Sequence, residues 1–147
     1  MNPNAYENYL KHEIEGASQG KLIVMLYDAA VKFMKRAIAA IEEKNIQGAH
    51  DNIIRTENIF YELMSTLNTD EGGEIAATLL KLYDYIIWEL IEANRLKSSE
   101  KLETLIKLIE PVRGAWKEVA ARDAAAKEPV GAAKGVPADH KPVNFSG

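Results

Sequence analysis

The chain has 147 residues, of which 47% are hydrophobic and 27% charged, so its composition is that of one globular domain and excludes wholesale disorder. It contains no cysteine, which excludes disulfides, thiolate catalysis and cysteine-bound metal. Its net charge of -4 makes nucleic acid an unexpected partner, and no apolar run approaches the roughly 18 residues of a membrane span. No signal peptide is expected, because residues 1–20 contain no hydrophobic stretch.

The first segment, residues 1–17, is predicted to be an N-terminal arm. Tyr6, Tyr9 or Leu10, and Ile14 form a short apolar edge, and Gly16 supplies a hinge after it. Two interpretations stay open at this point. The arm is either a detachable segment that packs into a groove between helices, or a static extra turn that completes the core.

Two long helices follow the arm. The first is predicted from a cap at Ser18 to Lys44, with an apolar stripe spaced near 3.6 residues: Leu22, Leu26, Ala29, Phe33, Ala37, Ala40 and Ile41. The second is predicted over residues 45–67. Its stripe alternates steps of three and four residues and consists of Ile46, Ala49, Ile53, Thr56, Phe60, Leu63 and Leu67.

A turn at residues 68–73 separates these from a third helix, predicted over residues 74–94. Its inward stripe is Ala76, Leu79, Tyr83, Ile86, Leu90 and Ala93, and Leu80, Ile87 and Ile91 widen it. The same spacing places Tyr85 and Trp88 on the outer side of this helix. Large aromatic residues that face outward are favoured anchors in protein interfaces, although core packing against a neighbouring helix is an alternative.

A fourth helix begins after a cap at Ser98 or Ser99. Its stripe is Leu102, Leu105, Ile109, Val112, Trp116 and Val119, and Pro111 predicts a kink. From Ala124 the chain becomes rich in alanine, proline and glycine, which is typical of a flexible tail, although its alanines can prolong the helix by a turn or two.

Four amphipathic helices with short connections predict an all-α fold, an antiparallel up-down-up-down four-helix bundle. The expected organisation is therefore an arm at residues 1–17, a bundle domain at residues 18–123 and a flexible tail at residues 124–147.

Catalytic and metal chemistry find little support in this pattern. A di-iron bundle requires a glutamate three residues before a histidine, but Tyr9 precedes His12 and Gln47 precedes His50 at that spacing. The predicted inward stripes of the four helices are apolar apart from Thr56 and Tyr83. No enzyme activity, cofactor or metal is therefore expected.

Lys32, Lys35 and Arg36 lie on one face of the first helix and form a basic group. They suit a phosphate or an acidic partner, but three charges on one helix face are more often a solvated surface. From the sequence alone, we interpret this basic group as a solvated surface.

Short motifs in a fixed order connect the chain to a known family over about residues 4–120. They are Asn4-Ala5-Tyr6 with Tyr9, Ala17-Ser18, Leu22-Ile23, Met25-Leu26-Tyr27-Asp28, Gly72-Gly73-Glu74-Ile75-Ala76, Leu82-Tyr83-Asp84-Tyr85, Glu92-Ala93-Asn94 and Ala115-Trp116. Because these motifs occur in this order and at this spacing, the chain resembles the flagellin-specific export chaperones, the FliS family. Three positions depart from the usual pattern: Gln19 replaces a proline, Ala29 a glycine, and Trp88 a polar or basic residue.

The resemblance implies a cytoplasmic chaperone that binds the C-terminal segment of flagellin, prevents its premature polymerisation and helps to deliver it to the flagellar export gate. On that basis the arm is expected to occupy part of the binding groove until cargo displaces it. Leu22, Leu26, Ile53, Phe60 and Tyr83 are expected in the groove or in the core beneath it. The full set of predicted partner-binding residues adds Tyr6, Tyr9, Leu10, Ile14, Tyr85 and Trp88.

The main alternative from the sequence is a helical interaction module with another partner, such as a bundle that dimerises through Tyr85, Trp88 and Ile91.

Overall fold

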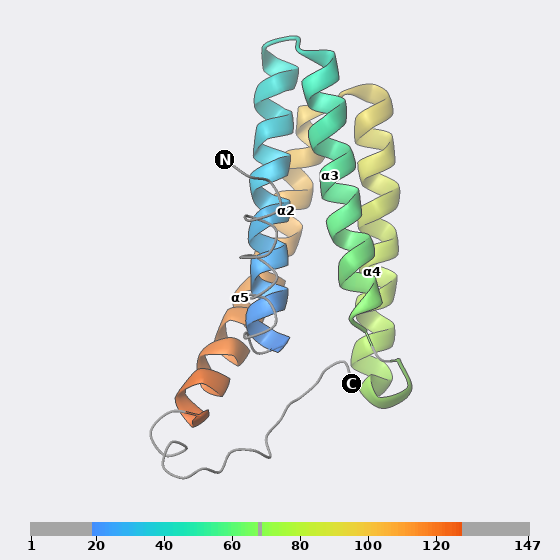
Figure 1. Cartoon of the computed structure of the whole chain (residues 1–147). Coiled ribbons are helices and arrows are strands. Elements are labelled where there is room, and N and C mark those ends of the chain that lie inside the picture. Colours follow the sequence, from blue (N-terminus) through green and yellow to red (C-terminus); the bar gives the residue numbers. More distant parts are fainter. Residues whose placement is uncertain (1–18, 68, 128–147) are drawn as a thin grey trace, which may run out of the picture.

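The computed structural model describes residues 19–67 and 69–127, and in this part of the chain all regular structure is helical. The helices are α2 (Gln19–Glu42), α3 (Ile46–Ser65), α4 (Thr69–Leu96) and α5 (Ser99–Lys127). Successive helices run in opposite directions, as Figure 1 shows. The predicted all-α bundle is therefore confirmed. The predicted arm and most of the predicted tail lie outside the described residues, while α5 continues four residues into the tail, to Lys127.

Each helix packs against two neighbours. Helix α2 contacts α3 and α5, and α4 contacts the same two helices from the other side. Helices α2 and α4 therefore lie diagonally across the bundle, and their outward faces point to opposite sides of the molecule (Figure 1). Helix α2 packs closely against α5 at Gly20, where an added Cβ would lie 3.3 Å from the backbone of Ala120.

The helix ends follow local capping chemistry. The Asn45 side chain accepts a 2.9 Å hydrogen bond from the Gly48 amide at the start of α3. The Ser98 hydroxyl accepts one of 3.1 Å from the Lys101 amide at the start of α5. Within α4, Gly73 has φ 58° and ψ -134°, a conformation that residues with a Cβ rarely adopt, and it separates a short helical segment that starts at Thr69 from the longer part of α4. The longer part starts at Glu74, where the third helix was predicted to start, but the predicted turn at residues 68–73 is wrong for residues 69–72, which are helical.

The centre of the core is an aromatic cluster contributed by three helices. Tyr27 of α2, Phe60 of α3 and Tyr83 of α4 are at most 1% exposed, with ring centroids 5.8–6.4 Å apart in tilted or edge-on arrangements. The two tyrosine hydroxyls form a 2.7 Å hydrogen bond across the diagonal. Burial raises the pKa of both hydroxyl groups, so both stay neutral, and each is the hydrogen-bond partner of the other.

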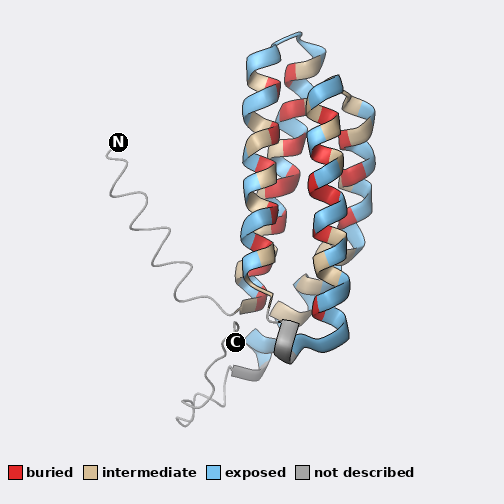
Figure 2. Ribbon diagram, turned by 90° about the vertical axis from the view of Figure 1, so that its right-hand side faces the viewer, coloured by how far each residue is buried: buried red, intermediate tan, exposed pale blue. Residues whose placement is uncertain are grey.

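The buried residues form a continuous inward stripe on the helices, coloured red in Figure 2. The inward stripes predicted for α3, α4 and α5 are largely correct. Thr56 is fully buried, and its hydroxyl donates a 2.9 Å hydrogen bond to the carbonyl oxygen of Asn52 one turn earlier. Ile46 is an exception, since it is 57% exposed at the very start of α3, where the partner helices no longer cover it.

The predicted inward stripe of α2 is wrong in its N-terminal half. The residues at the core are Ile23, Tyr27, Ala30 and Met34, while the predicted Leu22, Leu26, Ala29 and Phe33 are only half-buried. The predicted stripe was displaced by one residue, or about 100° around the helix. The cause is that α2 is apolar on more than one side, so periodicity alone did not identify the face that carries the larger core residues.

Helix α5 runs without interruption through Pro111. In Figure 1 its C-terminal part changes direction relative to its first part, which agrees with the kink expected at the proline. Among the described helices, none combines the length and the apolar character that crossing a membrane requires.

Candidate partner-binding surface

Large apolar side chains gather on the outward side of α4 and on the helices next to it. Trp88 is 59% exposed, Tyr85 52% and Ile91 41%; Tyr61 of α3, at 52%, and Leu108 of α5, at 38%, lie on the flanking helices. The predicted outward position of Tyr85 and Trp88 is confirmed. We call these five residues the exposed apolar face.

Helix α4 carries this face because it has two sets of apolar residues. Tyr83, Ile86 and Leu90 point into the core and are at most 1% exposed. Tyr85, Trp88 and Ile91 repeat at intervals of three residues, so they form a series that runs from the outward side of the helix toward α3, where Ile91 lines a cleft. Exposed aromatic residues in such a series are typical of protein interfaces, because they bury a large area at a low cost in side-chain entropy.

The register of α3 against α4 places Tyr61 beside this series. His50 Nδ1 and Asn94 Nδ2 lie 3.0 Å apart and connect the start of α3 to the end of α4. The helices are antiparallel, so Tyr61, about three turns after His50, is level with the part of α4 about three turns before Asn94. Tyr61 is therefore level with Tyr83 of α4, and Trp88 lies a little more than one turn further along α4. The exposed apolar face therefore extends across the α3–α4 boundary.

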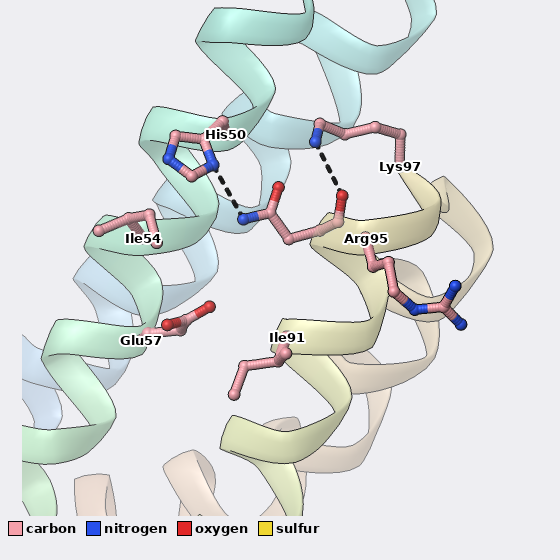
Figure 3. Close-up of a pocket in the computed structure, with 7 residues that line it drawn as sticks. His50, Ile54, Glu57, Ile91, Arg95 and Lys97 are labelled. Atoms are coloured by element: carbon pink, nitrogen blue, oxygen red, sulfur yellow. Dashed lines mark hydrogen bonds between the residues drawn. The ribbon is translucent and has the colours of Figure 1, made fainter.

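A polar cleft lies at the end of the α3–α4 boundary near the α2–α3 loop (Figure 3). It is lined by His50, Ile54, Glu57, Ile91, Asn94, Arg95 and Lys97. Figure 3 shows Ile54 and Ile91 on facing helices below the hydrogen-bonded pair, and Lys97 Nζ donates a 2.8 Å hydrogen bond to the Asn94 carbonyl oxygen. The Asn94 Oδ1 atom is buried without a hydrogen-bond partner. The cleft thus joins the apolar face at Ile91.

Arg95, which lines the cleft, is paired within α4, and a second ion pair connects α4 to α5. Arg95 donates a 2.8 Å hydrogen bond to Glu92, which lowers the pKa of that carboxyl, and Lys101 of α5 pairs with Glu89 at 2.9 Å. Burial raises the pKa of Glu57, and the charge of His50 opposes that shift. No group of three or more metal-binding side chains is present in the described ranges, 19–67 and 69–127.

The structure separates the other predicted site residues into two groups. Leu22 and Leu26 are half-buried on α2, and Leu26 packs against the core. Ile53, Phe60 and Tyr83 are core residues, at most 1% exposed. For these three, which the sequence left open between groove and core, the structure shows the core. Tyr6, Tyr9, Leu10 and Ile14 lie outside the described residues.

Sequence reasoning missed Tyr61, Ile54 and Leu108. The signal for Tyr61 was available, since it directly follows Phe60 and successive residues of a helix are rotated by about 100°. Phe60 was assigned to the inward stripe, so Tyr61 had to point away from it. His50 was interpreted as a solvated histidine, and it is exposed, but it also pairs with Asn94.

The fold and this surface define a class of protein, a small helical bundle with an exposed apolar face of the kind that other polypeptides bind. Comparison with known proteins identifies the family: residues 2–123 match the family model described as "Flagellar protein FliS". The chain belongs to this family.

Several curated relatives support the assignment. The flagellar secretion chaperone FliS of Bacillus subtilis (strain 168) is 32% identical over 115 residues, which are 78% of this chain and 85% of the relative. That of Campylobacter jejuni (strain 81116) is 34% identical over 119 residues, 81% of this chain and 93% of the relative. The Salmonella typhimurium protein is 32% identical over 107 residues, 72% of this chain and 79% of the relative.

Proposed function

We propose that this protein is a cytoplasmic export chaperone that binds the C-terminal segment of flagellin. Bound in this way, the segment is withheld from other flagellin subunits, and the subunit is kept ready for the flagellar export apparatus. Export gate components are then a second class of partner. The observation that carries the proposal is the exposed apolar face on α4 and its neighbours, in a chain that belongs to the FliS family.

The shape of the surface suits an extended or helical segment. The regular part of α4, residues 74–96, spans about 35 Å at about 1.5 Å per residue. An amphipathic segment that docks along it buries its apolar side in steps of three and four residues, and the steps of three between Tyr85, Trp88 and Ile91 match part of that repeat. A filament subunit's end that is apolar and unpaired before assembly gains most from such a surface, because binding covers area that otherwise promotes aggregation.

The N-terminal arm is proposed as an internal competitor for the same surface. The apolar edge of Tyr6, Tyr9, Leu10 and Ile14 would cover apolar residues of the bundle in the free protein, and cargo would displace it. Deleting residues 1–16 is then expected to raise the affinity for flagellin or to cause self-association. If neither property changes, the arm has only a structural role.

The test is co-purification of the chain with flagellin from the same bacterium, either complete or lacking about the last forty residues, a length on the scale of helix-in-groove ligands. Complete flagellin is expected to co-purify and the truncated form to be lost. Equal recovery of both forms would contradict the proposal. Size-exclusion chromatography with light scattering is the companion measurement, since a stable dimer through Tyr85, Trp88 and Ile91 would occupy the surface that the cargo needs.

A further inference from the structure

A second surface of this protein, on the opposite side from the exposed apolar face, is basic although the chain as a whole is acidic. It is centred on Lys32, Lys35 and Arg36, which are exposed on the outward face of α2. Arg113 approaches from α5, and Arg55 from α3. We call these five residues the basic face. The sequence connects only the three residues of α2; the fold adds the two arginines from the flanking helices.

The basic face contains a cleft between α2 and α5. Its lining combines charged and apolar groups: Asp28, Val31, Lys32, Lys35, Arg36, Ala39 and Arg113. Val31, at 8% exposed, is the buried apolar residue of this lining. A ligand for such a site needs negative charge for the lysines and arginines and apolar groups for the cleft between them.

Each of the three arginines of this face already contacts another side chain of the bundle. Arg113 donates hydrogen bonds of 2.5 Å to Asp28 and 2.9 Å to Glu110, and the bond to Asp28 is the main cause of its raised pKa. The guanidinium carbons of Arg36 and Arg55 lie 5.6 and 5.7 Å from the centroid of the Phe33 ring. Fixed guanidinium groups lose less entropy when they bind a carboxylate than free side chains do.

Within the part of the chain that the structure describes, the two lysines have no partner of this kind. Among the described residues, no carboxylate lies within ion-pair distance of Lys32 or Lys35, and none lies within it of Arg36 or Arg55. Arg113 engages both Asp28, the carboxylate that lines the cleft, and Glu110 of its own helix. The cationic charge of the face is therefore left largely uncompensated.

From this arrangement we infer that the basic face is a docking site for an acidic amphipathic helix of a second protein, separate from the export cargo. The occupant carries glutamate or aspartate toward Lys32, Lys35 and Arg36 and places small aliphatic residues in the α2–α5 cleft. The apolar lining and the net charge of -4 favour a peptide over a polyphosphate. Because α2 and α4 are diagonal, the second protein and the cargo can be bound at the same time.

The test uses the full chain and a designed, fluorescently labelled helical peptide of about 14 residues, or about 21 Å, with glutamates on one side and alanine and valine on the other. Binding is followed by anisotropy at about 0.15 M salt. The variant K32Q/K35Q/R36Q is expected to weaken binding about tenfold or more, since it removes three contacts of the charge-assisted type. The matched control K44Q/K81Q/K107Q removes three cations elsewhere and is expected to bind as the unmodified chain does.

Three further probes decide whether the occupant is of the proposed class. They are a peptide of the same composition in shuffled order, a single-stranded oligonucleotide of similar charge, and vesicles that contain phosphatidylglycerol. All three are expected to bind more weakly than the amphipathic peptide. Equal binding of the shuffled peptide, or tighter binding of the oligonucleotide or the vesicles, overturns the proposal. So does an amphipathic peptide that fails to bind, or that binds both glutamine variants alike.

Co-purification of flagellin with K32Q/K35Q/R36Q keeps this inference distinct from the proposed function. The variant is expected to retain flagellin, because none of the three substituted residues lies on the exposed apolar face. Loss of flagellin with this variant, but not with K44Q/K81Q/K107Q, would assign the basic face to the cargo and overturn the inference. The peptide measurement needs no flagellin, so its outcome stands even if the cargo is a different protein.

Discussion

The same kinds of residue serve opposite purposes inside and outside this bundle. In the interior, Tyr27, Phe60 and Tyr83 pack in edge-on or tilted arrangements, and the two tyrosine hydroxyl groups form a hydrogen bond with each other. On the exterior, Tyr61, Tyr85 and Trp88 are each more than half exposed. The interior cluster lowers the free energy of the folded chain, whereas the exterior residues leave apolar area uncovered until a partner binds. Exposed aromatic residues that do not stabilise the fold need another explanation, and partner binding supplies it.

The largest expected effect is on the interior side of this comparison. Phe60→Ala removes the ring that contacts both tyrosines and leaves a cavity, so the free energy of unfolding is expected to fall by about 3–5 kcal/mol. Urea denaturation followed by circular dichroism measures it. Tyr61→Ala, on the next residue, is the matched control and is expected to stay within about 0.5 kcal/mol of the parent. Similar losses for both variants would contradict the assignment of inside and outside.

The exterior counterpart is the double substitution Y85A/W88A. We expect the free energy of unfolding to change little, while flagellin binding weakens by about 2 kcal/mol or more, a factor of about thirty, because interface aromatic residues dominate binding energy. Titration calorimetry with complete flagellin measures the affinity. Ile46→Ala, at an exposed apolar residue outside the face, is the control. An unchanged affinity would remove the exterior aromatic residues from the cargo site.

The tyrosine hydroxyl pair gives a sharper test of the interior. Tyr83→Phe leaves the buried Tyr27 hydroxyl without its partner, so the free energy of unfolding is expected to fall by about 1 kcal/mol or somewhat more. The double variant Y27F/Y83F removes both groups and is expected to recover most of that loss. Chemical denaturation of both single variants and the double variant yields the coupling energy. Additive losses would show that the hydroxyls do not depend on each other.

The smallest expected effect concerns pH. Burial raises the pKa of Glu57 above its ordinary value of 4.5, so the native state holds this proton more tightly than the unfolded chain does. The resulting stabilisation is present below the ordinary pKa and is lost as the pH rises through the raised native value. Glu57→Gln cannot titrate and is expected to gain stability relative to the parent as the pH rises through that range. Urea denaturation from about pH 4 to about pH 7 tests the sign; a relative loss contradicts it.

The sequence predicts the fold well where each helix has one clear apolar stripe. In α4 the alternation that contains Tyr83 and Ile86 also determined that Tyr85 and Trp88 face outward. In α2 the same reasoning failed by one residue, because apolar side chains occur around most of that helix and only the packed neighbours decide which of them is buried.

Contacts between distant helices could not be predicted from periodicity. The Tyr27–Tyr83 hydrogen bond depends on the relative heights of two diagonal helices, and so does the His50–Asn94 contact for two adjacent ones. The basic face also depends on how the helices pack. Arg55 and Arg113 are far apart in the sequence, and each contacts α2 from a different neighbouring helix, Arg55 at Phe33 and Arg113 at Asp28. Periodicity assigns a side to each residue, but the height at which two helices meet is set by loops and packing.

The fluorescence of Trp88 tests the central claim most directly. In the variant Trp116→Phe, Trp88 is the remaining tryptophan, and it is 59% exposed in the unbound bundle. Adding complete flagellin is expected to shift its emission to shorter wavelength and to protect it from iodide quenching, and flagellin without its C-terminal segment is expected to do neither. If complete flagellin binds the variant but leaves the emission and the quenching of Trp88 unchanged, the exposed apolar face is not the cargo site.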